Sequence, residues 1–168
     1  MPLIPEDGTN VTGANSYGDL DGYKAYASAR GLVIDADDTV LEQEMIAAMD
    51  FIEAQEPRFK GSRYYVDQAL SFPRSPMDYN GVNVAGEIPL QLQAAQYRLA
   101  YDASLTDDGQ LLATGESSLV TKEKIGPVEV EYSEKGSLNP APSYKAAMAL
   151  LTPLFTNAAT GGTFSITR

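Results

Sequence analysis

Residues 37–57 read DDTVLEQEMIAAMDFIEAQEP, and this stretch decides the fold class. Its apolar side chains return every three or four residues, which places them on one face of a helix. The paired aspartates at its start are typical of a helix N-terminus, and Pro57 interrupts the pattern. We therefore predict a long amphipathic helix over residues 37–55. Its apolar face comprises Leu41, Met45, Ile46, Met49 and Ile52, and we expect Glu42, Glu44, Asp50 and Glu53 mostly on the opposite side.

Three more helices are expected around this one. Residues 19–31 begin with aspartates that can cap a helix and end on a glycine, which suits a helix C-terminus. A third helix begins near Pro89 and ends before Asp107, with apolar residues at helical spacing between them. A fourth, short helix runs over residues 144–154, with Ser143 as its cap. The apolar face of the third helix comprises Leu92, Ala95, Leu99 and Ala103.

The pattern changes to period two over residues 119–132, where apolar residues alternate with glutamates after the Gly126-Pro127 break. This alternation predicts a β-hairpin with an acidic outer face. Asn80-Gly81 is a second hairpin-turn signal. The fold class is therefore mainly α: a small helical domain of about four helices with a β-hairpin and extended N- and C-terminal arms. We divide the chain into a helical domain, residues 1–154, and an extended docking tail, residues 155–168.

The amino-acid composition limits the catalytic and metal-binding chemistry that the chain can perform. The 168 residues include no Cys and no His, so thiolate nucleophiles, zinc–thiolate sites and the commonest general base are absent. No phosphate-binding loop occurs, and the string Asp35–Asp38 lacks the spacing of a calcium loop, which makes helix capping its better explanation. We expect no catalytic residues, no metal and no cofactor, and therefore no enzyme. Neither a membrane span nor a secretion signal is expected.

The number and placement of the charged residues indicate whether the chain is suited to bind nucleic acid. The chain carries 12 basic and 23 acidic residues, a net charge of −11. A nucleic-acid site needs clustered Lys and Arg to neutralise phosphates, but here only Arg58, Lys60 and Arg63 lie close together in sequence. Ten tyrosines could stack on single-stranded bases, although most fall on predicted apolar faces, which favours core or subunit-interface roles.

The C-terminal tail leaves two readings open. It is small and polar except for Phe164 and Ile166, which alternate near its end. Such a segment can be a disordered tail, or a strand that pairs with the exposed sheet edge of a partner and places alternate side chains in pockets.

Several strings resemble a family of tailed-phage proteins that is often labelled DnaT-like single-stranded-DNA-binding protein. The likeness spans nearly the whole chain, and its most specific parts are the strings 70–74 and 126–132. In size and helical layout this family is similar to phage head-tail connector (adaptor) proteins. Many relatives have Trp where this chain has Phe72, and the aromatic character is retained. The strings that carry the resemblance are Glu6–Thr9, Ala14–Tyr17, Tyr26-x-x-x-Arg30-Gly31, Ile52-Glu53, Gln68–Arg74 and Lys124–Tyr132.

The resemblance implies two functions that are electrostatically opposed. The family label implies single-stranded-DNA binding. The connector likeness implies a structural virion protein: a ring of about twelve copies between portal and tail. A ring of chains that each carry −11 would repel DNA from its wall, whereas a DNA binder needs the opposite field. We therefore expect the connector, with single-stranded-DNA binding as the alternative.

The connector reading implies partners and sites. The partners are the portal protein, tail-completion or tail-terminator proteins, other copies of the chain, and passing double-stranded DNA without sequence-specific binding. The location is the neck of the virion, after assembly in the host cytoplasm. We expect the portal-docking tail to use Phe155, Phe164, Ile166 and Arg168, the hairpin interface to use Ile125, Val128, Val130 and Tyr132, and loop contacts to involve Phe72 and Arg74.

Overall fold

The computed structural model describes residues 2–35, 37–79, 81–106, 109, 111–112 and 144–156, together with the backbone of residues 122–125 and 128–131. The chain forms two compact units, of which the first comprises residues 1–111 and 144–168 and the second residues 112–143. The first unit holds the helices, and the second holds a β-hairpin. The predicted fold class, a mainly helical small domain with a β-hairpin, is confirmed.

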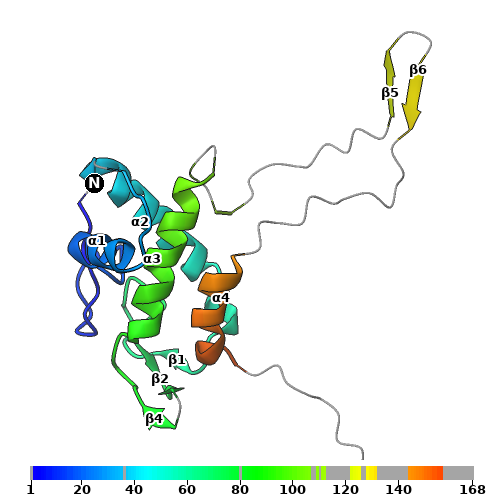
Figure 1. The fold of residues 1–168 in the computed structure, drawn as a ribbon. Coiled ribbons are helices and arrows are strands. Elements are labelled where there is room, and N and C mark those ends of the chain that lie inside the picture. The colour runs from blue at the N-terminus through cyan, green and yellow to red at the C-terminus, as the bar shows by residue number, and fades with distance from the viewer. Residues whose placement is uncertain are drawn as a thin grey trace, which may run out of the picture. The chain divides into compact units, whose positions relative to one another are not determined.

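Four α-helices build the first unit (Figure 1). Helix α3 packs against each of the other three, and α1 also touches α2, so α3 lies at the centre of the core. Its bounds agree with the predicted helix, and the four apolar residues predicted for its inner face are all fully buried. The helices are α1 (Leu20–Ala29), α2 (Asp38–Glu53), α3 (Leu90–Ser104) and α4 (Lys145–Leu151), and a 3-10 turn η2 (Thr152–Leu154) follows α4.

The caps explain where the first two helices begin. The Asp19 side chain accepts a hydrogen bond of 2.6 Å from the Gly22 amide at the start of α1. The Asp37 side chain does the same for the Thr39 amide, at 2.8 Å, at the start of α2. Each cap satisfies an amide that has no partner inside its helix. Gly31 follows α1 with a φ of +63°, the left-handed conformation that glycine adopts easily. The caps predicted for these helices are therefore present.

Short strands join α2 to α3. After the 3-10 turn η1 (Glu56–Arg58), β1 (Ser62–Arg63) pairs antiparallel with β2 (Arg74–Ser75). Strands β3 (Asp78–Tyr79) and β4 (Val82–Asn83) pair antiparallel on either side of the predicted Asn80-Gly81 turn; Tyr79 faces Val82, Gly81 has a φ of +79°, and Asn80 lies outside the described residues. Among its described residues, the long connection thus contains two antiparallel pairs of two-residue strands.

The N-terminal segment before α1 is irregular but packed. The Glu6 carboxylate is 1% exposed and accepts hydrogen bonds from the amides of Gly8, Asn10 and Val11. One buried side chain therefore folds the loop around itself. Tyr17, further along, is 0% exposed and belongs to the hydrophobic core. The arm is consequently part of the body of the first unit.

The second unit contains the hairpin predicted near residues 119–132. Strand β5 (Lys122–Ile125) pairs antiparallel with β6 (Val128–Glu131), and Ile125 is the partner of Val128 at the turn end. The backbone pairing agrees with the alternation seen in the sequence. The fourth helix is also present, but its predicted cap, Ser143, lies outside the described residues.

Two expectations for α2 are wrong. Glu44 and Glu53 were expected mostly on the solvent side of the helix, yet Glu44 is only 7% exposed, and Glu53 is partly buried and accepts hydrogen bonds from Tyr17 and Ser71. The reason is that loops and α1 cover parts of α2 that an isolated amphipathic helix would expose. Both carboxylates find hydrogen-bond donors there, as buried charges require.

Candidate functional site

Three phenylalanines from distant parts of the chain meet beyond the C-terminal end of α2. Phe59 follows η1, Phe72 precedes β2, and Phe155 follows η2. The ring centroids of Phe59 and Phe72 lie 4.8 Å apart, and those of Phe59 and Phe155 lie 5.3 Å apart. All three rings are buried. We call this cluster, together with Arg58 and Arg74, the tail anchor, because the last described residues end here.

The backbone also fixes the last described residues to the tail anchor. Phe155 forms an antiparallel bridge with Phe59. The Lys60 amide donates to the Leu154 carbonyl at 2.9 Å, and the Thr156 amide donates to the Arg58 carbonyl at 2.7 Å. Residues 154–156 therefore run as an extended segment alongside residues 58–60. The chain beyond residue 156 starts from a defined point on the first unit.

The two arginines of the tail anchor have different roles. The Arg58 guanidinium lies 4.2 Å from the centre of the Phe155 ring, and its side chain is exposed. The Arg74 residue is 6% exposed, and its guanidinium donates to the carbonyls of Lys60, Gly61 and Ser71 at 2.6–3.1 Å. Arg74 therefore holds two loops together from inside, while Arg58 covers the ring from outside.

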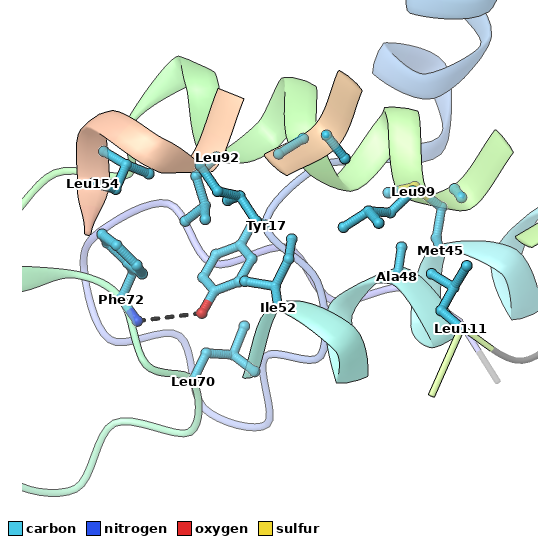
Figure 2. Packing of buried hydrophobic residues seen from close by; sticks show 14 of the residues in the cluster. Tyr17, Met45, Ala48, Ile52, Leu70, Phe72, Leu92, Leu99, Leu111 and Leu154 are labelled. Atoms are coloured by element: carbon cyan, nitrogen blue, oxygen red, sulfur yellow. Dashed lines mark hydrogen bonds between the residues drawn. The ribbon is translucent and has the colours of Figure 1, made fainter. Parts of the chain in front are cut away.

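A polar network around Glu53 holds the loop that carries Phe72. The Glu53 carboxylate accepts hydrogen bonds from the Tyr17 hydroxyl and from both the amide and the hydroxyl of Ser71, the latter two at 2.9 Å. Figure 2 shows the Tyr17 hydroxyl next to the Phe72 amide, which donates to it at 3.2 Å. Burial raises the pKa of Glu53, and the hydrogen bonds from Tyr17 and Ser71 act against that shift. The network fixes the loop that carries Phe72.

A second polar residue ties the N-terminal segment to the helices. Gln96 on α3 is fully buried, and its side-chain oxygen accepts from the amides of Tyr17 and Gly18 at 2.8 and 3.1 Å. Its amide nitrogen donates to the Ser16 hydroxyl and the Met45 carbonyl. Both acceptor sites and both N–H donors of the Gln96 side chain are thus used, and they join the N-terminal segment, α2 and α3.

Most basic side chains that the structure describes already have a partner within the chain. Lys24 pairs with Asp38 at 2.6 Å, Arg98 with Asp102 at 3.1 Å, and Arg63 with Glu56 at 2.8 Å. Four basic residues do gather beyond α2, but their charges are shared with a carboxylate, a ring or carbonyl oxygens. Within the described residues they form no continuous basic trough. These four are Arg58, Lys60, Arg63 and Arg74.

The structure unites residues that the sequence placed in two separate sites. Phe72 and Arg74 were predicted as loop contacts and Phe155 as part of the docking tail; all three lie in the tail anchor, where each is buried. The Phe155 ring packs into the core of its own chain, so in this structure it holds the tail's first residues. Contacts of these residues with a partner stay a prediction.

The remaining predicted site residues cannot be compared in the same way. Phe164, Ile166, Arg168 and Tyr132 lie outside the described residues. Ile125, Val128 and Val130 lie on β5 and β6, whose backbone alone is described. The division between a helical domain and a tail also stays a prediction, because residues 157–168 lie outside the described part.

Sequence reasoning missed Phe59, Glu53 and Gln96 as determinants of this site. Phe59 carried little signal, because a lone aromatic residue between Arg58 and Lys60 is shorter than the alternation that identifies a strand. Glu53 and Gln96 carried none, because their partners are at least 18 residues away in the sequence.

Two searches of the described residues were negative. No helix among them is long and apolar enough to cross a membrane. No group of three or more acidic residues in the same part of the chain is placed so that it could hold a metal ion.

Comparison with known proteins identifies a family. No curated protein and no solved structure matches the chain. A family model with the description "Putative DnaT-like ssDNA binding protein" matches residues 1–168, which is the full length of the sequence. The chain therefore belongs to the family of DnaT-like ssDNA binding proteins.

Proposed function

We propose that the chain is a head-tail connector of a tailed phage, a structural subunit that forms a ring between portal and tail. The observation that carries this proposal is the tail anchor. It holds residues 154–156 against residues 58–60 and so presents the C-terminal tail from a fixed point. An anchored tail loses less conformational freedom when it docks on a neighbour than a tail that begins in a loose segment.

The length and pattern of the tail suit docking on another protein. Residues 157–168 could span at most about 40 Å when extended. Phe164 and Ile166 would lie on the same side of such a strand, where both can enter pockets beside the sheet edge of a partner. In the proposed assembly this partner is the portal, and the second unit contacts tail-completion proteins or a neighbouring copy.

Electrostatics supports a wall that DNA passes rather than a groove that holds it. The chain has a net charge of −11, and the described basic residues mostly have acidic, carbonyl or aromatic partners inside the chain. A ring of such chains would repel the phosphate backbone, an effect that salt screens. The proposed role is structural and non-enzymatic, located in the neck of the virion, with no part in a membrane.

Single-stranded-DNA binding is the second candidate, and two observations favour it. The family description names this activity. In addition, the only clustered basic string in the sequence continues into Tyr64 and Tyr65, and the Tyr64 ring is 50% exposed next to Arg63. A base could stack on Tyr64 while Arg58 and Arg63 neutralise phosphates. Any such binding should therefore depend on this string.

The docking role can be tested by removing the tail. A chain that ends at Thr156 keeps the Phe155 ring and the backbone pairing, so it should melt within about 2 °C of the full-length protein. It should fail to bind purified portal rings and fail to complete particles. The double variant F164D/I166D should behave in the same way, whereas N157D/T160D, which adds the same charge to the tail, should bind. Normal assembly by the truncated chain would contradict the docking role.

The second candidate can be tested by the salt dependence of binding to a labelled thymidine oligonucleotide at about 50 and 200 mM salt. The connector proposal expects weak binding at both concentrations. Tight binding at low salt with a steep salt slope, lost in R58A/Y64A and retained in K145A, would instead support the DNA binder. Lys145 is a suitable control because it is an exposed basic residue on α4, distant in sequence from the basic string.

A further inference from the structure

A pocket of about 250 Å³ lies between α2 and α3, at the end of α2 opposite the tail anchor. It is formed by the first turns of α2 and by the last turn of α3 with the residues that follow it. We call it the α2–α3 pocket. Its lining residues are Val40, Gln43, Glu44, Ala103, Ser104, Thr106 and Gly109.

Glu44 is the distinctive group of this pocket. It is a charged residue with only 7% exposure, and it lines the cavity. Within the described part of the chain its carboxylate accepts a single hydrogen bond, 3.0 Å long, from the Tyr23 hydroxyl on α1. An ionised carboxylate can accept about four. Burial raises the pKa of Glu44, the hydrogen bond from Tyr23 acts against that shift, and the charge of Asp35 adds to it. The carboxylate therefore has acceptor capacity that no group in the described part of the chain uses, and it borders the cavity.

The other polar groups of the pocket also favour a ligand that carries hydrogen-bond donors. The Ser104 hydroxyl donates to the Tyr101 carbonyl at 2.7 Å, and the Thr106 hydroxyl donates to the Ala103 carbonyl at 2.8 Å. Because their hydrogens are committed, these two oxygens can only accept from a ligand. The C-terminal end of α3 adds the partial negative charge of a helix terminus. Only Gln43 among the lining residues could donate from its side chain, and none is basic.

We propose that the α2–α3 pocket binds an alkylammonium or alkylguanidinium group, with Glu44 as its counter-ion. The chemistry is that of a lysine or arginine side chain on a protein partner, or of a free amine. Its apolar stem would lie against Val40, while its several N–H donors would meet Glu44, Ser104 and Thr106. An anionic ligand would meet a carboxylate and almost no donors. This inference does not depend on the connector function.

The test is an NMR titration of the full-length, ¹⁵N-labelled protein with n-butylammonium and, separately, with n-propylguanidinium. We expect saturable shifts of amide signals that are largest at residues 40–44 and 103–106. The variant E44Q should bind at least tenfold more weakly. The matched control D50N removes the same charge from an exposed position on α2, about 9 Å along the helix, and should bind as the parent does.

A second variant, S104L, tests ligand binding in the pocket independently of the stability of E44Q. Ser104 is an exposed residue of the pocket rim, so S104L keeps Glu44 and narrows the cavity; it should abolish the localised shifts. Three results would each overturn the proposal: unchanged affinity in E44Q, unchanged affinity in S104L, or equally strong binding of neutral 1-butanol.

Sedimentation measurements show whether the cation comes from a second copy of the chain or from another source, namely another protein or a free amine. If the protein self-associates and saturating n-butylammonium disperses it, the natural guest is a basic side chain of a second copy. If the protein is monomeric and still binds the amine, the guest comes from another protein or is a free amine. Both results follow from the same charge chemistry, and the Glu44→Gln variant should lose the effect in either case.

Discussion

Two glutamates of α2, the buried Glu44 and the partly buried Glu53, differ in how many hydrogen bonds their carboxylates accept. Glu53, at the C-terminal end, accepts hydrogen bonds from the Tyr17 hydroxyl and from two groups of Ser71. Glu44, nine residues earlier, accepts one from Tyr23 and borders a cavity. A carboxylate that accepts several hydrogen bonds on both oxygens fixes the structure around it, whereas one with unused capacity beside a cavity is available to a ligand. The same residue type thus serves folding at one end of a helix and, in our proposal, recognition at the other.

The two ends of α2 differ in packing as well. At the C-terminal end the chain's own residues 154–156 cover Phe59, and the rings of Phe59, Phe72 and Phe155 interlock. At the N-terminal end Val40 is 36% exposed and lines the pocket. Truncating a side chain of the tail anchor should therefore be costly, whereas truncating Val40 at the pocket should be tolerated. This contrast can be measured.

The largest effect is expected from Phe72→Ala. The ring is fully buried between Tyr17 and Phe59, so its removal leaves a cavity that should lower the free energy of unfolding by about 3–5 kcal/mol. Val40→Ala at the pocket end should cost less than about 1 kcal/mol. Urea unfolding followed by circular dichroism measures both. Equal losses in the two variants would show that the ends of α2 do not differ in packing.

The next largest effect is expected from Glu53→Gln. Both carboxylate oxygens accept hydrogen bonds, one from Ser71 N–H and the other from two hydroxyls. A glutamine offers one acceptor oxygen and one NH₂. With its oxygen toward the Ser71 amide, its NH₂ can donate to the two hydroxyls, but their hydrogens then lose the oxygen that accepted them. We expect a loss of about 1–3 kcal/mol in the same unfolding measurement. The shape-matched comparison is Glu44→Gln, which is expected to cost far less; a loss as large as that of Glu53→Gln would contradict the distinction between the two carboxylates.

The helices could be predicted from sequence because their signals are local. The 3.6-residue period, Asp19, Asp37 and Gly31 all act within one or two turns, and the structure places the ends of α1 and α2 within two residues of the predicted ones. The hairpin of β5 and β6 was likewise visible as a period-two pattern. Local patterning therefore determined most of the fold.

The site could not be predicted in the same way because its contacts are not local. Glu53 contacts Ser71, which is 18 residues later in the sequence, and Tyr17, which is 36 residues earlier. The ring of Phe59 packs on that of Phe155, although the two residues are far apart in the sequence. No periodic pattern reports such pairs. The residues Phe72, Arg74 and Phe155 were selected, but their meeting in one cluster follows only from the fold. The solvent-side placement of Glu44 failed for the same reason, since α1 covers it.

The smallest expected effect concerns Glu44→Gln and its pH dependence. Burial raises the pKa of Glu44 in the folded chain above its unfolded value, so folding favours the protonated carboxyl. The stability that this group contributes is present at low pH and is lost as the pH rises through the raised pKa. At pH 7 the neutral glutamine avoids that loss, and its oxygen can still accept from the Tyr23 hydroxyl.

Glu44→Gln should therefore be within about 1 kcal/mol of the parent at pH 7, and at least as stable. The parent should gain melting temperature as the pH falls from 7 toward the unfolded-state pKa of glutamate, about 4.3, and the variant should gain less. Part of the gain should remain in the variant, because burial also raises the pKa values of Asp50, Glu53 and Asp102. A variant clearly less stable than the parent at pH 7 would mean that the Glu44 charge is already compensated inside the chain. The carboxylate would then have no need of a cationic guest, and the contrast with Glu53 would disappear.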